Sequence, residues 1–264
     1  MMRDDLTKTW QWQSAEGLPY LTCSLLEQWP HGFFTQPFYP RTPEDLSKIL
    51  EPSADVYRVK QVHGNRVLSP DEIRQELPQE GFPSADGIVT NLQKQSIWVA
   101  SADCTPVLIG DAVTGNIAAV HAGWRGTAKR IVPEAIARLQ TWGSEMENLR
   151  IAMGPAISGE VYQVSDEVAG EVGASLFQKE QIDSLQGILN PLKKIANPPI
   201  LPDPEPGKVR LDVRRINQLQ LEQLGIKAQQ ISIAPYCTYQ SPSHFFSHRR
   251  SPERKVQWSG IVRI

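Results

Sequence analysis

Residues 101–130 read SADCTPVLIGDAVTGNIAAVHAGWRGTAKR, and this stretch decides the fold. Two apolar segments, VLIGD and NIAAVH, flank the loop AVTG, which predicts a β-hairpin. If the segments pair about that loop, His121 faces the chain near Pro106 and Val107, with Cys104 two or three residues beyond. At about 3.3 Å per residue, the backbones of Cys104 and His121 are then about 10 Å apart or less. A side chain from each can meet on one small ion.

A cysteine beside a histidine indicates either a metal site or an activated thiol. Catalytic zinc commonly takes three protein ligands from Cys, His and acidic residues and leaves a fourth position open. His63 in KQVHGNRV is the best third ligand, because it ends a predicted strand and Gly64 lets the backbone turn. Asp103 and Asp86 are alternative ligands or hydrogen-bond partners of a ligating imidazole. The alternative without a metal makes Cys104 a small core residue and His63 a surface residue at a strand end.

Short strands and helices alternate along the rest of the chain. After the turn HAGWRGT, apolar residues recur at helical spacing, and Pro133 places the start of the regular helix near Val132. Residues 190–208 hold six prolines and predict a long surface loop. We predict one domain over residues 1–264. The other predicted segments are a hairpin at 9–26, an irregular loop at 30–43, helices at 43–50, 165–177 and 212–224, and strands at 55–62, 88–90, 96–101, 149–153, 230–234 and 256–264.

Length and charge narrow the function classes. The chain has 264 residues, 40% of them apolar and 21% charged, with a formal net charge of −2. That charge gives no general case for binding nucleic acid or an anionic membrane. The start MMRDDLTKTWQWQ lacks the basic and apolar regions of a signal peptide, and no apolar run has membrane-spanning length. Three cysteines spread far apart argue against a disulfide scaffold and favour a reducing cytoplasm.

The glycine turn is a candidate for binding an anion. Arg125, Lys129 and Arg130 cluster where this turn opens a helix, and backbone amides at a helix N-terminus attract phosphate. The alternative is that Gly123 and Gly126 only make a tight turn and that the charges form a solvated face. A phosphate bound here would lie beside the metal.

The C-terminal segment CTYQSPSHFFSHRR combines one cysteine, two histidines and two arginines. Its Cys-x6-His-x3-His spacing is like part of a zinc finger but lacks the second cysteine. Adjacent arginines after aromatic residues are suited to stacking on a base or pairing with phosphate, and equally to a surface ion pair. His248, Arg249 and Arg250 are therefore candidate substrate residues, together with Arg125.

Several segments carry a resemblance to a known family. QVHGNRV, ADGIVT, ADCTPVLI, AAVHAGWRG, MGPAISGEVYQV, the LD before the last helix and CTYQSPSHFFSHRR resemble, in order and spacing, the motifs of the laccase-domain family. This family is also called multicopper polyphenol oxidoreductase, and it includes bacterial purine nucleoside phosphorylases and the peptidoglycan editing factor. The match covers residues 31–264. It implies an α+β fold of mixed β-sheets layered with outer helices, distantly similar to a toxin deamidase that uses a Cys-His pair.

The resemblance also implies a site and a chemistry. Zinc would bind to His63, Cys104 and His121, and the activities would be phosphorolysis of purine nucleosides and deamination of adenosine. Adenosine, inosine, guanosine and methylthioadenosine are the implied nucleosides, with phosphate as the second substrate. Many relatives have cysteine where Ala156 stands and tyrosine where His248 stands, which argues against an obligatory metal role at 248. Many relatives carry an asparagine-arginine pair upstream of QVHG that this sequence lacks, and Arg41 is the candidate substitute.

The family name raises copper as the alternative metal. A multicopper oxidase needs a blue-copper site and a cluster held almost wholly by imidazoles. Five histidines, two of them claimed by the zinc site, cannot supply both. A single blue-copper site with a distant Met153 is formally possible, but it transfers electrons and does not by itself reduce dioxygen. Copper polyphenol oxidase (laccase) activity therefore ranks below nucleoside chemistry.

These residues support three hypotheses about function. In the first, a zinc-dependent nucleoside enzyme uses the open metal position to lower the pKa of a bound water, with Asp103 or His248 as the general acid. In the second, Cys104 is a nucleophile activated by His121 and acts on an amide or a peptidoglycan precursor. In the third, the chain is a non-catalytic module that a metal stabilises. The pattern carries no signal of oligomeric state.

Overall fold

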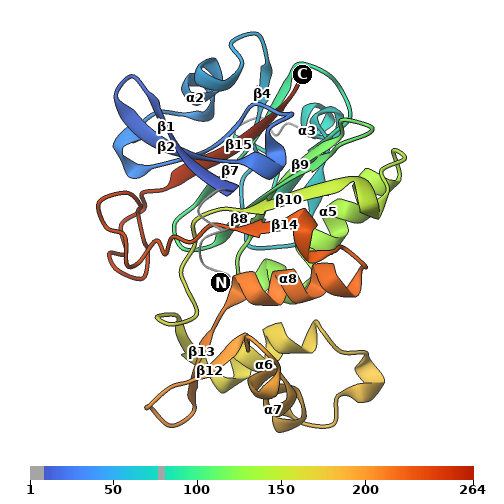
Figure 1. Cartoon of the computed structure of the whole chain (residues 1–264), viewed down its shortest axis with the longest axis vertical. Helices are drawn as coiled ribbons and strands as arrows, with labels where there is room; N and C mark the ends of the chain where they lie inside the picture. The colour runs from blue at the N-terminus through green and yellow to red at the C-terminus, as the bar shows by residue number, and fades with distance from the viewer. Residues whose placement is uncertain (1–8, 77–80) are drawn as a thin grey trace.

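The computed structural model describes residues 9–76 and 81–264, and the predicted hairpin lies at its centre (Figure 1). Every residue of the two hairpin strands is buried, and the register places Pro106 opposite His121, as predicted. Strands covered on both faces read as continuous apolar runs, which explains VLI and IAAV. In the described chain they belong to a six-stranded sheet in the order β14-β10-β8-β9-β6-β5. The strands are β8 (Thr105–Asp111), β9 (Ile117–Ala122), β14 (Ile231–Ile233), β10 (Leu149–Met153), β6 (Gly87–Thr90) and β5 (Val67–Leu68).

A second sheet stacks on the first, and the apolar side chains between them form the main core. Ile97 from the second sheet and Ile88 and Leu108 from the first are fully buried there. The hairpin predicted at 9–26 is confirmed. The strand predicted at 55–62 stops at Tyr57, because the chain then leaves this sheet and Lys60 bridges to Ser84 beside the first sheet. The described strands, in spatial order, are β1 (Trp10–Ala15), β2 (Leu18–Cys23), β3 (His31–Phe34), β15 (Gln257–Arg263), β7 (Gln95–Ser101) and β4 (Asp55–Tyr57).

The prediction of an irregular loop at 30–43 is wrong, because this segment contains β3. All four residues of β3 are buried, and the strand pairs with β2 on one side and β15 on the other. Its run HGFF is a short apolar strand that prolines on both sides disguise. A 3-10 helix, η2 (Gln36–Phe38), follows. The helix predicted at 43–50 is confirmed as α2 (Pro43–Leu50), where Thr42 and Asp45 form a capping box.

Two helices cover the outer face of the first sheet. α5 (Ile131–Gln140) packs on β9 and β6, and α8 (Val213–Gln223), capped by Asp212 as predicted, lies beside α5. A shorter helix, α4 (Trp124–Ala128), precedes α5, and the chain breaks between them at Arg130, whose φ is +59°. Pro133 lies in the first turn of α5, where its missing N–H removes no intrahelical bond. The helix predicted to begin near residue 132 is therefore confirmed.

A smaller lobe lies below the two sheets in the view of Figure 1. Its three strands, in the order β11-β13-β12 within the described chain, pack with two helices around a separate apolar cluster. The predicted surface loop at 190–208 is wrong, because this segment holds the end of α7, all of β12 and the start of β13. Pro202 is tolerated because β12 is an edge strand. The elements are β11 (Gln163–Ser165), α6 (Asp166–Ala174), α7 (Leu185–Lys194), β12 (Ile200–Pro202) and β13 (Lys208–Leu211).

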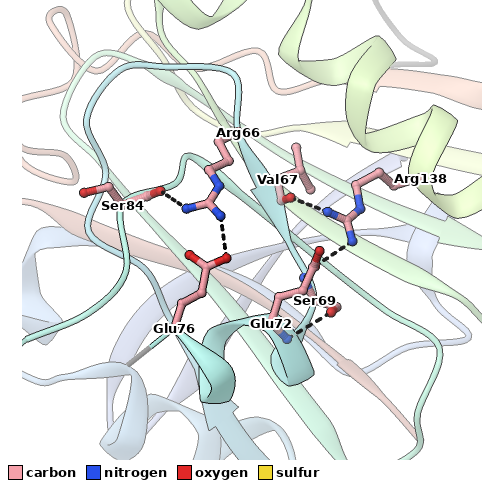
Figure 2. Close-up of polar contacts among 7 residues, drawn as sticks. All are labelled: Arg66, Val67, Ser69, Glu72, Glu76, Ser84 and Arg138. Atoms are coloured by element: carbon pink, nitrogen blue, oxygen red, sulfur yellow. Dashed lines mark hydrogen bonds and ion pairs between the residues drawn. The ribbon is translucent and has the colours of Figure 1, made fainter. Parts of the chain in front are cut away.

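A polar network fastens the chain just after His63 to α5 (Figure 2). Arg138 of α5 reaches the β5 backbone and α3 (Pro70–Gln75) together, while Arg66 reaches the far end of α3. Ion pairs as exposed as these add little stability each. Their effect is to hold β5 and α3 in position against α5. The contacts drawn are Arg138 to the Val67 carbonyl (2.6 Å) and Glu72 (2.6 Å), Arg66 to Glu76 (2.5 Å) and the Ser84 carbonyl (3.4 Å), and the Glu72 amide to the Ser69 hydroxyl (3.3 Å).

Short 3-10 helices complete the described chain, and they connect the strands and helices above. None of the helices in residues 9–76 and 81–264 combines the length and the apolar character needed to cross a membrane. Cys23, Cys104 and Cys237 are all free thiols. The remaining 3-10 helices are η1 (Ser24–Leu26), η3 (Met146–Asn148), η4 (Lys179–Gln181) and η5 (Ala228–Gln230).

Candidate metal and active site

The structure brings together the three residues predicted to bind a metal. One ligand atom from each of His63, Cys104 and His121 lies within 4.8 Å of the others. His63 comes from the loop before β5, Cys104 from the turn before β8, and His121 from the end of β9. The two imidazole rings are 4.9 Å apart between centroids and nearly perpendicular, at 81°. Bound to one zinc ion, tetrahedral ligand atoms lie about 3.4 Å apart, so small side-chain movements close the site.

The backbone at two of these positions has an unusual conformation. His63 has a φ of +59°, and Asp103, directly before Cys104, has a φ of +90°. Residues with side chains rarely adopt this left-handed region, and such strain persists only where surrounding contacts hold it. At His63 those contacts come from Asp86, whose carboxylate accepts hydrogen bonds from the backbone N–H groups of His63 (2.9 Å) and Gly64 (2.7 Å).

Asp86 also orients the second imidazole. Its Oδ1 lies 2.9 Å from Nδ1 of His121, and both side chains are almost completely buried. Nε2 of His121 is thereby left for the metal, which is the usual arrangement of a ligating histidine. Burial alone raises the pKa of the Asp86 carboxyl, but the bonds from His121 and Gly64 lower it below its ordinary value. One ionised carboxylate therefore positions two of the three ligands.

The glycine turn makes room for the third ligand. A Cβ built on Gly123 would lie only 2.8 Å from Sγ of Cys104 and 3.4 Å from Cδ2 of His63. A Cβ on Gly126 would lie 2.9 Å from the carbonyl oxygen of Gly64. Both glycines therefore let the HAGWRG turn pack directly against Cys104, His63 and Gly64. This close packing is a reason for glycine at both positions that does not involve phosphate binding.

The charges of the triad favour a metal-binding thiolate. Burial alone raises the pKa of the Cys104 thiol, but the imidazoles of His121 and His63 outweigh it and bring that pKa down to about 6. Burial alone lowers the pKa of His121, whereas the Cys104 thiolate and the Asp86 carboxylate raise it above its ordinary value. A thiolate and two imidazoles form a donor set that zinc and copper both accept. The residues present therefore fit a transition-metal ion.

Asp103, predicted as a general acid, braces the turn that carries Cys104. Its Oδ1 accepts a hydrogen bond from the Thr238 hydroxyl at 2.6 Å, and its Oδ2 accepts one from the Arg249 backbone N–H at 2.7 Å. Its own carbonyl accepts from the N–H of Ile157 at 3.0 Å. The carboxylate thus ties the turn that carries Cys104 to the C-terminal segment, which gives it a positioning role.

A cavity of about 350 Å³ opens beside the triad. This volume falls at the small end of the range for ligand pockets, about 300–1,000 Å³. All three triad residues line it, and so does His248, one of the predicted substrate residues. The other lining residues are Val59, Gln61, Ala100, Ser101, Ala102, Glu253, Arg254, Lys255, Val256 and Trp258.

The three predicted arginines lie outside the set of described residues that line this cavity. The Arg125 guanidinium lies over the Trp124 ring, 4.2 Å from its centroid. The Arg249 guanidinium lies 4.8 Å from the centroid of the Tyr162 ring and donates to the Gln163 carbonyl at 2.9 Å.

Arg250 is used within its own loop. Its guanidinium donates to the backbone carbonyls of Thr238 (2.6 Å), Tyr239 (2.9 Å) and Phe245 (2.6 Å). These bonds take up three of the five N–H donors of the guanidinium and brace the segment that carries His248. Arg41 pairs with Glu16 at 2.6 Å on the surface and does not line the cavity.

Tyr162 is a site residue that reasoning from the sequence missed. Burial and the Cys104 thiolate raise the pKa of its phenol to about 12, against the opposing charges of Arg249 and Arg125. The charges of the Cys104 thiolate, Arg249 and Arg125 therefore all act on this phenol, and the Arg249 guanidinium stacks on its ring. The signal for it in the sequence is its place in MGPAISGEVYQV, one of the motifs that resemble the family.

The remaining histidines do not add a second metal cluster. All five lie in the described part of the chain, and within that part the triad is the group of His, Cys, Asp and Glu side chains found close enough to share an ion. His31 is buried and bonded through both ring nitrogens to the backbone of Cys23 and Trp29. Met153 is buried in the apolar cluster under α5. The described residues therefore do not form a multicopper oxidase site.

Comparisons with known proteins identify the family of this chain and several named relatives. A family model described as multi-copper polyphenol oxidoreductase laccase matches residues 44–262. A Synechocystis protein named purine nucleoside phosphorylase is 53% identical over 263 residues, covering 99% of this chain and 98% of its own. A protein named adenosine deaminase, from an unknown prokaryotic organism, is 31% identical over 200 residues, covering 74% of this chain and 70% of its own.

A solved structure supports the fold. The crystal structure of YlmD from Geobacillus stearothermophilus has a TM-score of 0.76 at 23% identity, covering 96% of this chain and 98% of that chain. The predicted α+β architecture of mixed sheets and outer helices is therefore confirmed. With the family model spanning most of its length, the chain belongs to the multicopper polyphenol oxidoreductase family, the laccase-domain family predicted from its motifs.

Proposed function

We propose that this chain is a zinc-dependent enzyme that cleaves purine nucleosides with phosphate and deaminates adenosine. The observation that carries the proposal is a thiolate and two imidazoles, from Cys104, His63 and His121, gathered at the wall of an open cavity. Relatives named purine nucleoside phosphorylase and adenosine deaminase support the two activities. Adenosine, inosine, guanosine and methylthioadenosine are the proposed nucleosides.

Zinc is preferred to copper because the donor set matches an open catalytic zinc site. His63, Cys104 and His121 would hold a zinc ion with a fourth position open, and the ion would supply Lewis-acid activation of a water or of a substrate oxygen or nitrogen there. A blue-copper site would also need a weak axial ligand, and Met153 is packed in the core instead. Copper therefore remains the less favoured metal.

The chain's own residues divide the remaining work. Asp86 holds His63 and His121 in position, and Asp103 holds the turn of Cys104. His248, at the cavity wall, is the proposed general acid, because Asp103 is already bonded through both carboxylate oxygens.

Arg125 and Arg249 are proposed to contact the nucleoside on the Tyr162 side of the thiolate. Each guanidinium is already stacked on an aromatic ring, which limits its freedom before substrate arrives.

Turnover with and without phosphate tests the proposal. We expect release of free purine base from inosine to require phosphate, and conversion of adenosine to inosine to proceed without it. Both reactions should disappear when a chelator removes the metal and return when zinc is added. Product analysis by liquid chromatography and elemental analysis of the same samples make the measurement. Full turnover in protein that contains no metal would contradict it.

A second candidate function rests on the sequence of contacts Asp86–His121–Cys104, which has the order of a hydrolase triad. In that reading Cys104 attacks an amide, for example in a peptidoglycan precursor, and no metal is needed. The imidazole would accept the thiol proton, and the carboxylate would orient it.

Alkylation of Cys104 separates the two candidates. In zinc-loaded protein we expect iodoacetamide to leave Cys104 unmodified until a chelator is added. In metal-free protein it should react at neutral pH, and the rate should fall as the pH drops through about 6, the pKa of the Cys104 thiol. Mass mapping gives an internal control, because burial raises the pKa of Cys23 to about 11 and should keep it unreactive. Immediate modification of protein that carries a full equivalent of zinc would favour the hydrolase.

A further inference from the structure

One wall of the cavity carries a positive charge that the proposed chemistry above does not use. Arg254 lines the cavity together with the metal triad and is exposed. It has no hydrogen bond or ion pair with any of the residues 9–76 and 81–264. The neighbouring charges differ in this respect, because Lys255 and Glu253 are paired with each other at 2.6 Å.

Arg249 and Arg250, in the same C-terminal segment, lie outside the set of described residues that line this cavity. Arg250 is spread over three backbone carbonyls, and Arg249 is held by the Gln163 carbonyl and the Tyr162 ring. Since Glu253 and Lys255 offset each other, the Arg254 charge is the uncompensated one on this wall. A triad of one thiolate and two neutral imidazoles holding a divalent ion would add a second positive centre beside the same cavity.

An open guanidinium facing a cavity is chemically suited to an oxyanion. Arginine keeps its charge at all physiological pH values and presents paired N–H groups that match two oxygens of a phosphate. Arg254 and a metal ion held by the triad would place two positive charges at a cavity of about 350 Å³. Such a cavity disfavours a cationic ligand and favours a small anion beside a neutral substrate.

We propose that Arg254 binds the inorganic phosphate that attacks the nucleoside. The inference rests on the proposed phosphorolysis, and it assigns phosphate to a residue different from the three arginines predicted from the sequence. In the reaction, a phosphate oxygen forms a bond to C1′ of the ribose, the bond from C1′ to the purine nitrogen breaks with its electron pair, and that nitrogen takes up a proton. Arg254 holds the phosphate in place for this step.

This assignment separates the two proposed activities. Deamination of adenosine exchanges an amino group for an oxygen from water and involves no phosphate. Arg254→Ala should therefore raise the KM for phosphate in inosine cleavage about 10- to 100-fold, because a charge-assisted bidentate contact is lost. The ratio of phosphorolysis to deamination, measured at fixed phosphate below KM, should fall at least tenfold. Arg254→Lys should recover part of the loss.

Lys48→Ala provides the control for loss of one positive charge. Lys48 lies on α2, pairs with Asp45 at 3.4 Å and is outside the set of described residues that line the cavity, so the KM for phosphate should change less than threefold. The inference is overturned if Arg254→Ala changes the KM for phosphate less than threefold. It is also overturned if phosphorolysis and deamination fall in the same proportion, because the residue would then act on the whole site.

Calorimetry distinguishes failure of this inference from failure of the proposed function. Inorganic phosphate titrated into the zinc-loaded protein should bind, and Arg254→Ala should weaken that binding at least tenfold, whether or not any nucleoside turns over. If the wild type cleaves inosine with phosphate and binding does not depend on Arg254, the function stands and the inference fails. If a nucleoside 5′-monophosphate binds through Arg254 and inorganic phosphate does not, the assignment to the free anion is overturned.

Discussion

His121→Ala should yield protein without metal and without either nucleoside activity. The substitution removes one of three ligands and also leaves the buried Asp86 carboxylate without its imidazole partner. Two ligands hold zinc weakly, and a buried charge that loses its partner is costly. We expect less than about a tenth of an equivalent of zinc and a loss in kcat/KM on the order of 10³-fold or more for both reactions. Elemental analysis and chromatographic assays on one preparation measure both quantities.

His244→Ala is the matched control for this substitution. His244 lies outside the triad and bonds through its ring to the neighbouring Ser243 hydroxyl, so its removal should leave the zinc content unchanged. Circular dichroism on both variants establishes that the fold is retained. Wild-type rates in His121→Ala protein that is demonstrably free of metal would refute the zinc proposal.

Gly123→Ala should damage the metal site although it removes no ligand. The new methyl group would lie 2.8 Å from Sγ of Cys104, closer than real Cβ atoms come, and 3.4 Å from the His63 ring. The thiolate must move away from the two imidazoles to make room. Substitutions of residues that position metal ligands typically weaken metal binding about 10- to 100-fold. We expect at least a tenfold loss of zinc affinity here. Competition with a chromophoric chelator measures it.

Gly143→Ala separates crowding of the thiolate from a general loss of stability. Gly143 has a φ of +84°. Among the described residues, no atom apart from those of its two chain neighbours lies within 4 Å of the position that a Cβ would take, so alanine strains the backbone without crowding a packed side chain. It should lower the free energy of unfolding by about 1 kcal/mol without changing zinc affinity. Equal zinc affinity in Gly123→Ala and the wild type would mean that the turn accommodates a side chain and that the close approach is not required.

Local signals predicted the elements that local chemistry determines. The hairpin loop sets the register of β8 and β9, so the facing positions of Pro106 and His121 could be read from the chain. Side-chain caps did the same for α2 and α8. The failures are segments whose partners lie far away: β3 pairs with β15, and β12 and β13 pair in a lobe that prolines disguise. The proline content of a segment is a local property, and it does not reveal whether a strand far away in the sequence will pair with that segment.

The site residues also fall into those that local sequence predicts and those that only the fold reveals. Ligand chemistry identified His63, Cys104 and His121, and the usual second partner of a ligating imidazole pointed to Asp86. The local sequence assigns no role to Tyr162 or Arg254, because their relation to the thiolate and the cavity exists only after the chain has folded.

The same limit explains why the sequence favoured Arg250 over Arg254 as a substrate residue. Residue type alone cannot tell an arginine whose N–H groups are taken up by backbone carbonyls, as in Arg250, from one that is open, as in Arg254. Only the folded structure, which brings those carbonyls to Arg250, makes the distinction.

The position of β15 has a consequence for synthesis of the chain. β15 lies between β3 and β7, and it follows both in the sequence by more than 150 residues. Until the ribosome has made β15, the edge of β3 and the edge of β7 that will flank it are both unpaired. His63, Cys104 and His121 are translated long before β15, whereas Arg254 and its neighbours in the cavity wall are translated directly before it. A nascent chain therefore contains His63, Cys104 and His121 early, whereas the strand that completes the second sheet and the cavity wall that carries Arg254 are both made late.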